Sequence, residues 1–341
     1  MNTGECARRW DAFWQGELYG RPPVVLSVPR EAHAPGPPHY RLRCTDAQAA
    51  AGQAQRYLQG RQWLGDARPA VQADLGPDQY AAFYGGQLRF AAQQDHTNWI
   101  DPFLPELPDA VTLQEDGALA QLERVLRTFR ADAVRAGVPD LHSNLDALSA
   151  MRGPDALAMD LYDEPELIRR IGRQLADDYP RIYMRLEQAA DWPTTGYSGW
   201  LPLWSRRRYA VTQCDFSCMI SCDCFDDFVL PLLQAEWAFL ADSVYHLDGV
   251  GALHHLPRLL EQERLHCIQW VPGAGQEPVY AWDDLLLRIQ AAGKAVIVSA
   301  PPEQVERLHG VLDPALVCYE TSCADRDQAE RLLERLERAP R

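Results

Sequence analysis

The fold is decided by two short apolar runs in the last third of the chain, Ser243-Val244-Tyr245-His246-Leu247-Asp248-Gly249 and Cys267-Ile268-Gln269-Trp270-Val271. Each has the length and the β-branched and aromatic content of a buried strand, and a helical stretch over residues 252–260 separates them. Strand-like runs at 295–299 and 316–320 repeat the pattern, with helices expected at 282–293, 303–312 and 325–338. Strands that alternate with helices at this spacing predict βαβ units and a parallel sheet.

The rest of the chain extends this pattern toward the N-terminus. The segment Arg21-Pro22-Pro23-Val24-Val25-Leu26-Ser27-Val28 predicts a buried strand that follows an amphipathic N-terminal extension. Helices are expected at 45–64, 155–163, 164–190 and 224–240, and extended segments at 70–75, 196–204 and 210–215. Pro231 should kink or interrupt the last of these helices, because proline lacks the backbone N–H.

Length and composition indicate one domain. The chain has 341 residues without a shift in composition, so we expect residues 1–341 to form a single α/β fold of the (β/α)8 TIM-barrel type with an N-terminal extension. A hydrophobic share of 47% and a charged share of 24% exclude a disordered chain or a coiled coil.

The charge balance excludes other partner classes. Lys and Arg number 33 and Asp and Glu 48, which gives a net charge of −15 and argues against nucleic acid or an anionic membrane as the main partner. No apolar run approaches the roughly 18 residues of a membrane helix, and the first residues do not resemble a signal peptide. We therefore expect a cytoplasmic protein with reduced cysteines.

His246 and Asp248 are the first candidate site residues. They lie two positions apart on one expected strand, so both side chains point to the same face, at the strand end where barrel enzymes carry their sites. An imidazole and a carboxylate placed in this way can bind a metal ion or exchange protons, or can form a purely structural pair. Cys323 follows the last strand and precedes a helix, a position that favours a thiolate. Together the three would leave a fourth zinc position open, as in catalytic zinc sites.

Other residues at the strand ends extend the candidate site. Gln269 offers a neutral hydrogen-bonding group, and Asp215 ends an expected extended segment. Aromatic side chains are expected to line a pocket for an organic substrate, with core packing as the alternative for each: Trp200, Trp204, Tyr245 and Trp270.

Four further cysteines are crowded into residues 214–224. Cys214, Cys218, Cys222 and Cys224 contain no C-x2-C pair, so ordinary thiols are favoured over a four-cysteine metal site. Ser221 or Asp223 is expected to cap the helix that follows.

Several motifs carry a family resemblance. They are Leu141-His142-x-x-Leu145-Asp146-x-Leu148, Asp215-Phe216-Ser217-x-Met219-Ile220-Ser221, Tyr245-His246-Leu247-Asp248-Gly249, Ile268-Gln269-Trp270-Val271-Pro272-Gly273-Ala274-Gly275 and Thr321-Ser322-Cys323. With these, nearly the whole chain resembles the uroporphyrinogen decarboxylase superfamily, most specifically between residues 196 and 275. The resemblance implies a (β/α)8 barrel and one of two chemistries. One is cofactor-free decarboxylation of the acetate arms of a tetrapyrrole, and the other is zinc-dependent methyl transfer from a methylated corrinoid protein to a thiol such as coenzyme M.

The motifs favour the second chemistry. The decarboxylases of the superfamily grip substrate carboxylates with an arginine-rich segment after the first strand, of which this chain keeps only Arg30. The methyltransferases bind zinc through a His-x-Cys pair and a later cysteine, and His246, Asp248 and Cys323 occupy those places. The resemblance thus implies zinc on these three residues, with Glu320 as a spare ligand and Gln269 and Asp215 orienting the substrate.

The functional hypothesis is therefore zinc-dependent methyl transfer from a corrinoid or a small methyl donor to a thiol or similar acceptor. One alternative is metal-free decarboxylation of a porphyrinogen-like or smaller carboxylated substrate, with Asp248 as the proton donor paired with His246. Another is a non-catalytic barrel that binds a small molecule, in which His246 and Asp248 would bond only to one another. The expected partners are a small-molecule substrate, a corrinoid protein and, in a homodimer, a second copy of the chain.

Overall fold

The central feature of the fold is a seven-stranded sheet with the strand order β2-β1-β11-β10-β9-β8-β7. The computed structural model describes residues 3–30, 35–90 and 97–338. The sheet strands are β1 (Val24–Pro29), β2 (Arg61–Gly65), β7 (Tyr209–Thr212), β8 (Asp242–Asp248), β9 (Cys267–Val271), β10 (Ala295–Ser299) and β11 (Val317–Ser322). Two small antiparallel pairs are β3 (Leu88–Arg89) with β4 (Trp99–Ile100), and β5 (Tyr197–Ser198) with β6 (Trp204–Ser205).

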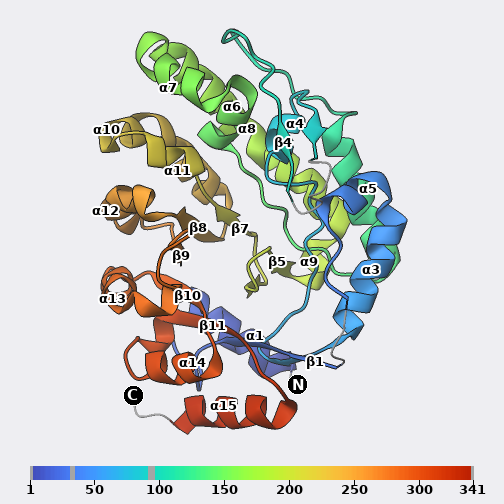
Figure 1. Cartoon of the computed structure of the whole chain (residues 1–341), viewed down its shortest axis with the longest axis vertical. Coiled ribbons are helices and arrows are strands. Elements are labelled where there is room, and N and C mark those ends of the chain that lie inside the picture. The colour runs from blue at the N-terminus through green and yellow to red at the C-terminus, as the bar shows by residue number, and fades with distance from the viewer. Residues whose placement is uncertain (1–2, 31–34, 91–96, 339–341) are drawn as a thin grey trace.

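Helices surround the strands, as Figure 1 shows. The α-helices are α1 (Thr3–Trp14), α2 (Tyr40–Thr45), α3 (Ala47–Gln59), α4 (Gln79–Ala82), α5 (Ala118–Ala131), α6 (Asn144–Arg152), α7 (Pro154–Asp163), α8 (Pro165–Ala190), α9 (Trp192–Thr195), α10 (Cys222–Cys224), α11 (Leu230–Phe239), α12 (Leu256–Leu260), α13 (Asp283–Ala291), α14 (Pro302–His309) and α15 (Arg326–Arg338). Short 3-10 helices are η1 (Asp215–Met219), η3 (Val250–His255), η4 (Val279–Ala281) and η5 (Pro314–Leu316), and η2 (Phe225–Val229) is a π-helix.

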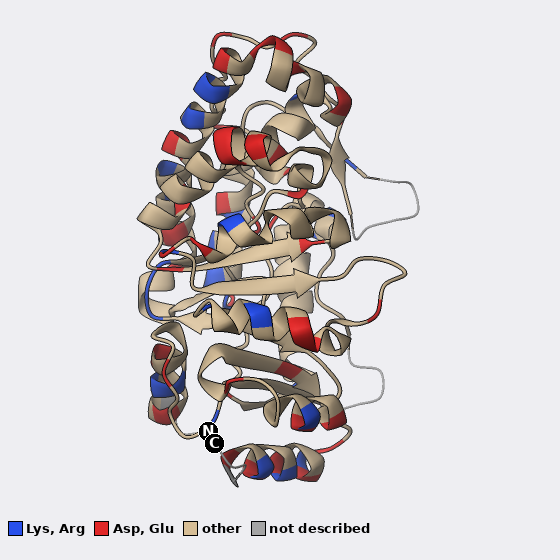
Figure 2. Ribbon diagram, turned by 90° about the vertical axis from the view of Figure 1, so that its left-hand side faces the viewer, with Lys and Arg blue, Asp and Glu red and all other residues tan. Residues whose placement is uncertain are grey.

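The alternation predicted for the last third of the chain is confirmed. Strands β8, β9, β10 and β11 fall at the expected positions and pair in parallel, with helical segments between them. The first strand, β1, pairs in parallel with the last strand, β11, so the N-terminal and C-terminal parts of the chain share one sheet. Figure 2 shows strands that are almost free of charged residues, while acidic and basic residues lie on the helices and loops around them.

The expected closed barrel is not formed by the described residues. The other side of β1 pairs with β2, which runs antiparallel and belongs to the segment predicted to continue a helix to residue 64. Because β2 occupies the edge where a second parallel barrel strand would pair, the ring stays open between β2 and β7. The segment 70–75, expected as a strand, contributes a single bridge between Val71 and Ala136.

The helix that contains Pro231 is irregular at the expected place. Its backbone is helical from Cys222 to Phe239, but the π-helix η2 (Phe225–Val229) directly precedes α11, and the proline in the first turn of α11 cannot donate a backbone N–H. Within the described part of the chain, no helix combines the length and the apolar character needed to cross a membrane.

Candidate functional site

His246 lies near the carboxyl end of β8, and the neighbouring strand orients its ring. Residue 246 is in register with Gln269 of β9, and His246 Nδ1 lies 2.6 Å from Gln269 Oε1. An amide oxygen only accepts hydrogen bonds, so Nδ1 carries the proton and Nε2 keeps its lone pair. The ring of Trp200 meets the imidazole edge to face, with centroids 5.1 Å apart.

Asp215 reaches the same place from η1. The carboxylate of Asp146, in α6, accepts the backbone N–H groups of Asp215 and Phe216, each at 2.9 Å, and so holds the first turn of η1. One ligand atom from each of Asp215, His246 and Asp248 lies within 4.8 Å of the other two. Three of the predicted site residues are thus brought together, and we call them the Asp215–His246–Asp248 cluster.

Cys323 does not belong to this cluster. Strands β9 and β10 separate β8 from β11, and Cys323 follows β11 with its backbone N–H bonded to the Ser27 carbonyl at 3.3 Å. The residue is buried, and this burial, followed by the charge of Asp325, raises the pKa of its thiol instead of lowering it as expected for a helix N-terminus. Asp215, predicted to orient substrate, rather than Cys323 lies beside His246 and Asp248.

An unpredicted second group adjoins the cluster. Ligand atoms of His142, Asp146 and Asp215 also lie within 4.8 Å of one another, and His142 Nε2 lies 3.1 Å from Asp140 Oδ2 and contacts the Gln213 amide. The sequence signal for this group is the polar pair His142 and Asp146 inside the 141–148 motif.

Opposite charges set the protonation of this second group. Burial alone would lower the pKa of His142, but the carboxylates of Asp140, Asp146 and Asp215 raise it to about 10, so the ring is a cation at neutral pH. Asp215 is exposed as a residue, yet its carboxyl is crowded by its neighbours. Its partial desolvation, and then the charge of Asp146, raise its pKa to about 6.

Strand alternation keeps most of the predicted aromatic residues away from the cluster. Side chains alternate along β8 and β9, so Tyr245 and Trp270 point to the opposite face of the sheet from His246 and Gln269. Both are buried, and Trp270 packs against Trp282. Trp204 is buried beneath the Arg68 guanidinium, 4.7 Å from its ring. Of the four aromatic residues, Trp200 is the one whose ring contacts His246, whereas Tyr245, whose hydroxyl pKa is raised mainly by burial, is near enough to Asp215 for that carboxylate to contribute to the rise.

Arg30 also lies apart. It is exposed at the end of β1, where its Nε donates to the Arg61 carbonyl at 3.3 Å. Arg30 is not among the residues that line the clefts beside Asp215 and Trp200.

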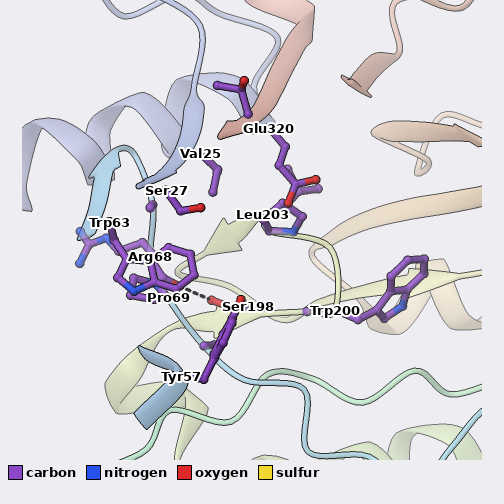
Figure 3. Close-up of a pocket in the computed structure, with 15 residues that line it drawn as sticks. Val25, Ser27, Tyr57, Trp63, Arg68, Pro69, Ser198, Trp200, Leu203 and Glu320 are labelled. Carbon is purple, nitrogen blue, oxygen red and sulfur yellow. Dashed lines mark hydrogen bonds between the residues drawn. The ribbon is translucent and has the colours of Figure 1, made fainter. Parts of the chain in front are cut away.

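One cleft adjoins the cluster at Asp215, and a second reaches it only through Trp200, which contacts His246. The larger has a volume of 460 Å³ and is lined by Asp215, His142, Asp146 and Phe216 among others. The smaller cleft has a volume of 150 Å³ and lies among side chains of β1, β11 and the 198–203 segment (Figure 3). Trp200 lines this cleft and also contacts the ring of His246. Glu320, the predicted spare ligand, lines the smaller cleft, where burial raises its pKa.

The arrangement differs from that expected of a non-catalytic barrel. His246 bonds to Gln269, and Asp248 is exposed, so the two do not form an isolated pair. The cluster therefore presents an imidazole nitrogen and two carboxylates toward accessible space.

Comparison with known proteins supports the fold. No model of a known protein family matches the chain, and no curated protein sequence matches it. A solved structure described as a methyltransferase from Methanosarcina mazei superposes with a TM-score of 0.55 and 12% sequence identity, over 97% of this chain and 98% of that one. At this identity the similarity concerns the fold.

Proposed function

We propose that this chain is a methyl-transferring enzyme in which Asp215, His246 and Asp248 hold a divalent metal ion, with zinc as the first candidate. The observation that carries the proposal is the convergence of three ligand atoms within 4.8 Å from two separate segments, η1 and the end of β8. The similarity in fold to a methyltransferase over almost the entire chain supports the reaction class.

The residues fit such a metal. Zinc accepts imidazole and carboxylate ligands, and its catalytic sites use three protein ligands and keep one position open. Gln269 fixes the tautomer of His246, so that Nε2 is the nitrogen available for coordination, as outer partners do in known metal sites. Bound there, the ion would act as a Lewis acid and lower the pKa of a coordinated thiol or water.

The surroundings determine which substrates suit the site. Trp200 packs on His246 and limits rotation of its ring, while Asp146 holds Asp215 through the first turn of η1. The larger cleft gives a substrate access to Asp215 and to the His142 cation. Because carboxylates outnumber this one cation, the cleft favours a neutral or cationic methyl carrier, or a methyl group presented by a corrinoid protein, over a polyanionic porphyrinogen.

Zinc binding and methyl transfer can be tested together. Zinc chloride is titrated calorimetrically into metal-free protein, and the same samples are assayed for demethylation of methylcobalamin in the presence of a small thiol. We expect Asp248→Asn and His246→Ala each to bind one zinc ion fewer per chain than wild type and to lose the demethylation activity. Asp109→Asn removes a carboxylate that is 95% exposed and far from β8 in the chain, and it should behave as wild type. Unchanged zinc binding in both cluster variants would refute the proposal.

A metal-free acid–base enzyme is the competing function. The observation in its favour is that burial and the charge of Asp146 raise the pKa of Asp215 to about 6, which brings this carboxyl closer to the range where it can exchange a proton with a substrate near neutral pH. The two functions respond differently to a chelator. Methyl transfer through the cluster should stop with the chelator and return with zinc, whereas carbon dioxide release that continues in the chelator would support decarboxylation.

A further inference from the structure

A third group of potential ligands shares no residue with the proposed centre. One ligand atom from each of Cys222, His254 and His255 lies within 4.8 Å of the others. Cys222 begins α10, directly after the Ser221 cap, while the two histidines end η3. Sulfur and two imidazoles thus converge from segments that are about thirty residues apart in the chain.

Both imidazoles have one nitrogen engaged and the other available. His254 Nε2 donates to the Ile220 carbonyl at 3.0 Å, and His255 Nε2 donates to the Ser217 carbonyl at 2.9 Å, because a carbonyl can only accept. In each neutral ring the lone pair is therefore on Nδ1. A backbone carbonyl bonded to the outer N–H is the arrangement that metal-ligating histidines commonly show.

His255 points most directly to a missing partner. The residue is 0% exposed, and its Nδ1 is buried without a hydrogen-bond partner. Leaving a buried acceptor unsatisfied destabilises the folded state, and a bound ion would relieve this cost. The ring is held from its other side by Phe225, stacked with centroids 4.3 Å apart, so it cannot readily turn to another partner.

We propose that Cys222, His254 and His255 bind a zinc ion through Sγ and the two Nδ1 atoms. A thiolate with two imidazoles suits zinc and excludes magnesium and calcium, which take oxygen ligands. Binding breaks the S–H bond of Cys222, releases that proton to solvent and forms the metal–sulfur bond, with no change in oxidation state. Cys222 is half-buried and His254 exposed, so the ion can enter from solvent.

This site would clamp the two segments that carry the proposed catalytic cluster. Asp215 begins η1, which precedes Cys222, and Asp248 lies two residues before η3, which ends at His255. A bond from each segment to one ion would hold the start of α10, which follows η1 in the chain, against the end of η3. The inference does not depend on methyl transfer, since it rests on different residues and a different donor set.

Cobalt(II) separates the two metal sites, because only a sulfur ligand produces a thiolate-to-cobalt charge-transfer band in the near ultraviolet. Metal-free full-length protein, kept reduced with a phosphine that carries no thiol, is titrated with cobalt chloride. We expect the band in wild type and in His246→Ala, and its loss together with one bound equivalent in Cys222→Ser. His254→Gln, at an exposed position, should weaken the same band even if a His255 variant does not fold.

The neighbouring thiols supply matched controls. Cys218 is exposed and Cys224 half-buried, yet neither belongs to the ligand group, so Cys218→Ser and Cys224→Ser should keep the band. As a second measurement, zinc should protect Cys222 from alkylation, followed by peptide mass spectrometry, while Cys218 stays reactive. A band that survives Cys222→Ser, or a wild-type protein that never shows one, would overturn the inference. Neither result changes the outcome expected for zinc binding by Asp248→Asn, because that variant tests the Asp215–His246–Asp248 cluster.

Discussion

The contact between His246 and Gln269 is a single hydrogen bond on which the proposed metal ligand depends. Gln269 Oε1 accepts from Nδ1 and leaves Nε2 for the metal. We predict that Gln269→Leu weakens zinc binding roughly 10- to 100-fold, as is usual when an outer partner of a ligand is removed. Gln269→Glu keeps an acceptor and should restore the affinity. Calorimetry checks both variants, with the exposed Gln234→Leu as the control. Equal zinc affinity in Gln269→Leu and wild type would exclude a positioning role for Gln269.

Glu236 shows how a buried carboxyl makes stability depend on pH. Its Oε1 accepts from Ser143 Oγ at 2.5 Å and Asn144 Nδ2 at 3.5 Å, while Oε2 is buried without a partner. Burial raises its pKa from 4.5 to about 8. Between these values the folded state holds a proton that the unfolded chain has lost, so this group's contribution to the free energy of unfolding falls as pH rises.

We therefore predict that Glu236→Gln becomes progressively more stable than wild type between about pH 4.5 and 8, with a constant difference above that range. The gain should reach a few kcal/mol, since one pKa unit corresponds to about 1.4 kcal/mol. Urea unfolding at several pH values measures it, and Glu261→Gln, at an exposed position, serves as the control without a growing gap. A difference that does not change with pH would show that Glu236 titrates normally.

At the scale of elements, a buried ionic group joins α1, β1 and the end of β2. Asp66 is 0% exposed and bonds to Arg9 at 3.1 Å and Arg21 at 2.5 Å, and it also accepts the backbone N–H of Val24 at 3.0 Å. The Arg-Pro-Pro-Val motif before the first strand thus has a structural partner, and Asp66 ties α1 to the segment that leads into β1.

Replacing Asp66 should destabilise the fold strongly. We predict a loss of about 3–5 kcal/mol in the free energy of unfolding for Asp66→Ala, because two buried guanidinium groups lose their counter-charge. Asp11→Ala, on the same α1, breaks an exposed pair with Arg206 and should cost less than about 1 kcal/mol. Chemical denaturation compares the two variants, and similar costs would contradict the structural role of Asp66.

At the scale of the molecule, β11 connects the two ends of the chain. It lies between β1 and β10, so without it β1 and β2 have no neighbour in the main sheet. We predict that a chain ending at Leu316 shows no cooperative thermal unfolding, whereas one ending at Asp325 keeps β11, loses only α15 and unfolds cooperatively at a lower temperature. Circular dichroism distinguishes them. A cooperative transition near the wild-type temperature in the shorter chain would show that β1 docks without β11.

The predictability of each part follows from the range of the interactions involved. Strands β8 to β10 could be predicted because apolar runs of five to seven residues between helices are a local signal. The antiparallel β2 could not, since residues 61–65 continue a helical spacing and become a strand only through pairing with β1. In the site, the shared face of His246 and Asp248 follows from strand periodicity, but the sequence has no signal that Asp215 rather than Cys323 approaches them.

The sequence by itself determined the alternation of strands and helices, the parallel order of the last strands and the placement of His246 with Asp248 at a strand end, because these depend on spacing within a few residues. The tertiary structure alone decided that the ring of strands stays open, that Asp215 completes the cluster and that Cys222 meets His254 and His255. Each of these depends on contacts between segments distant in the chain, whose approach is determined by packing over the whole core.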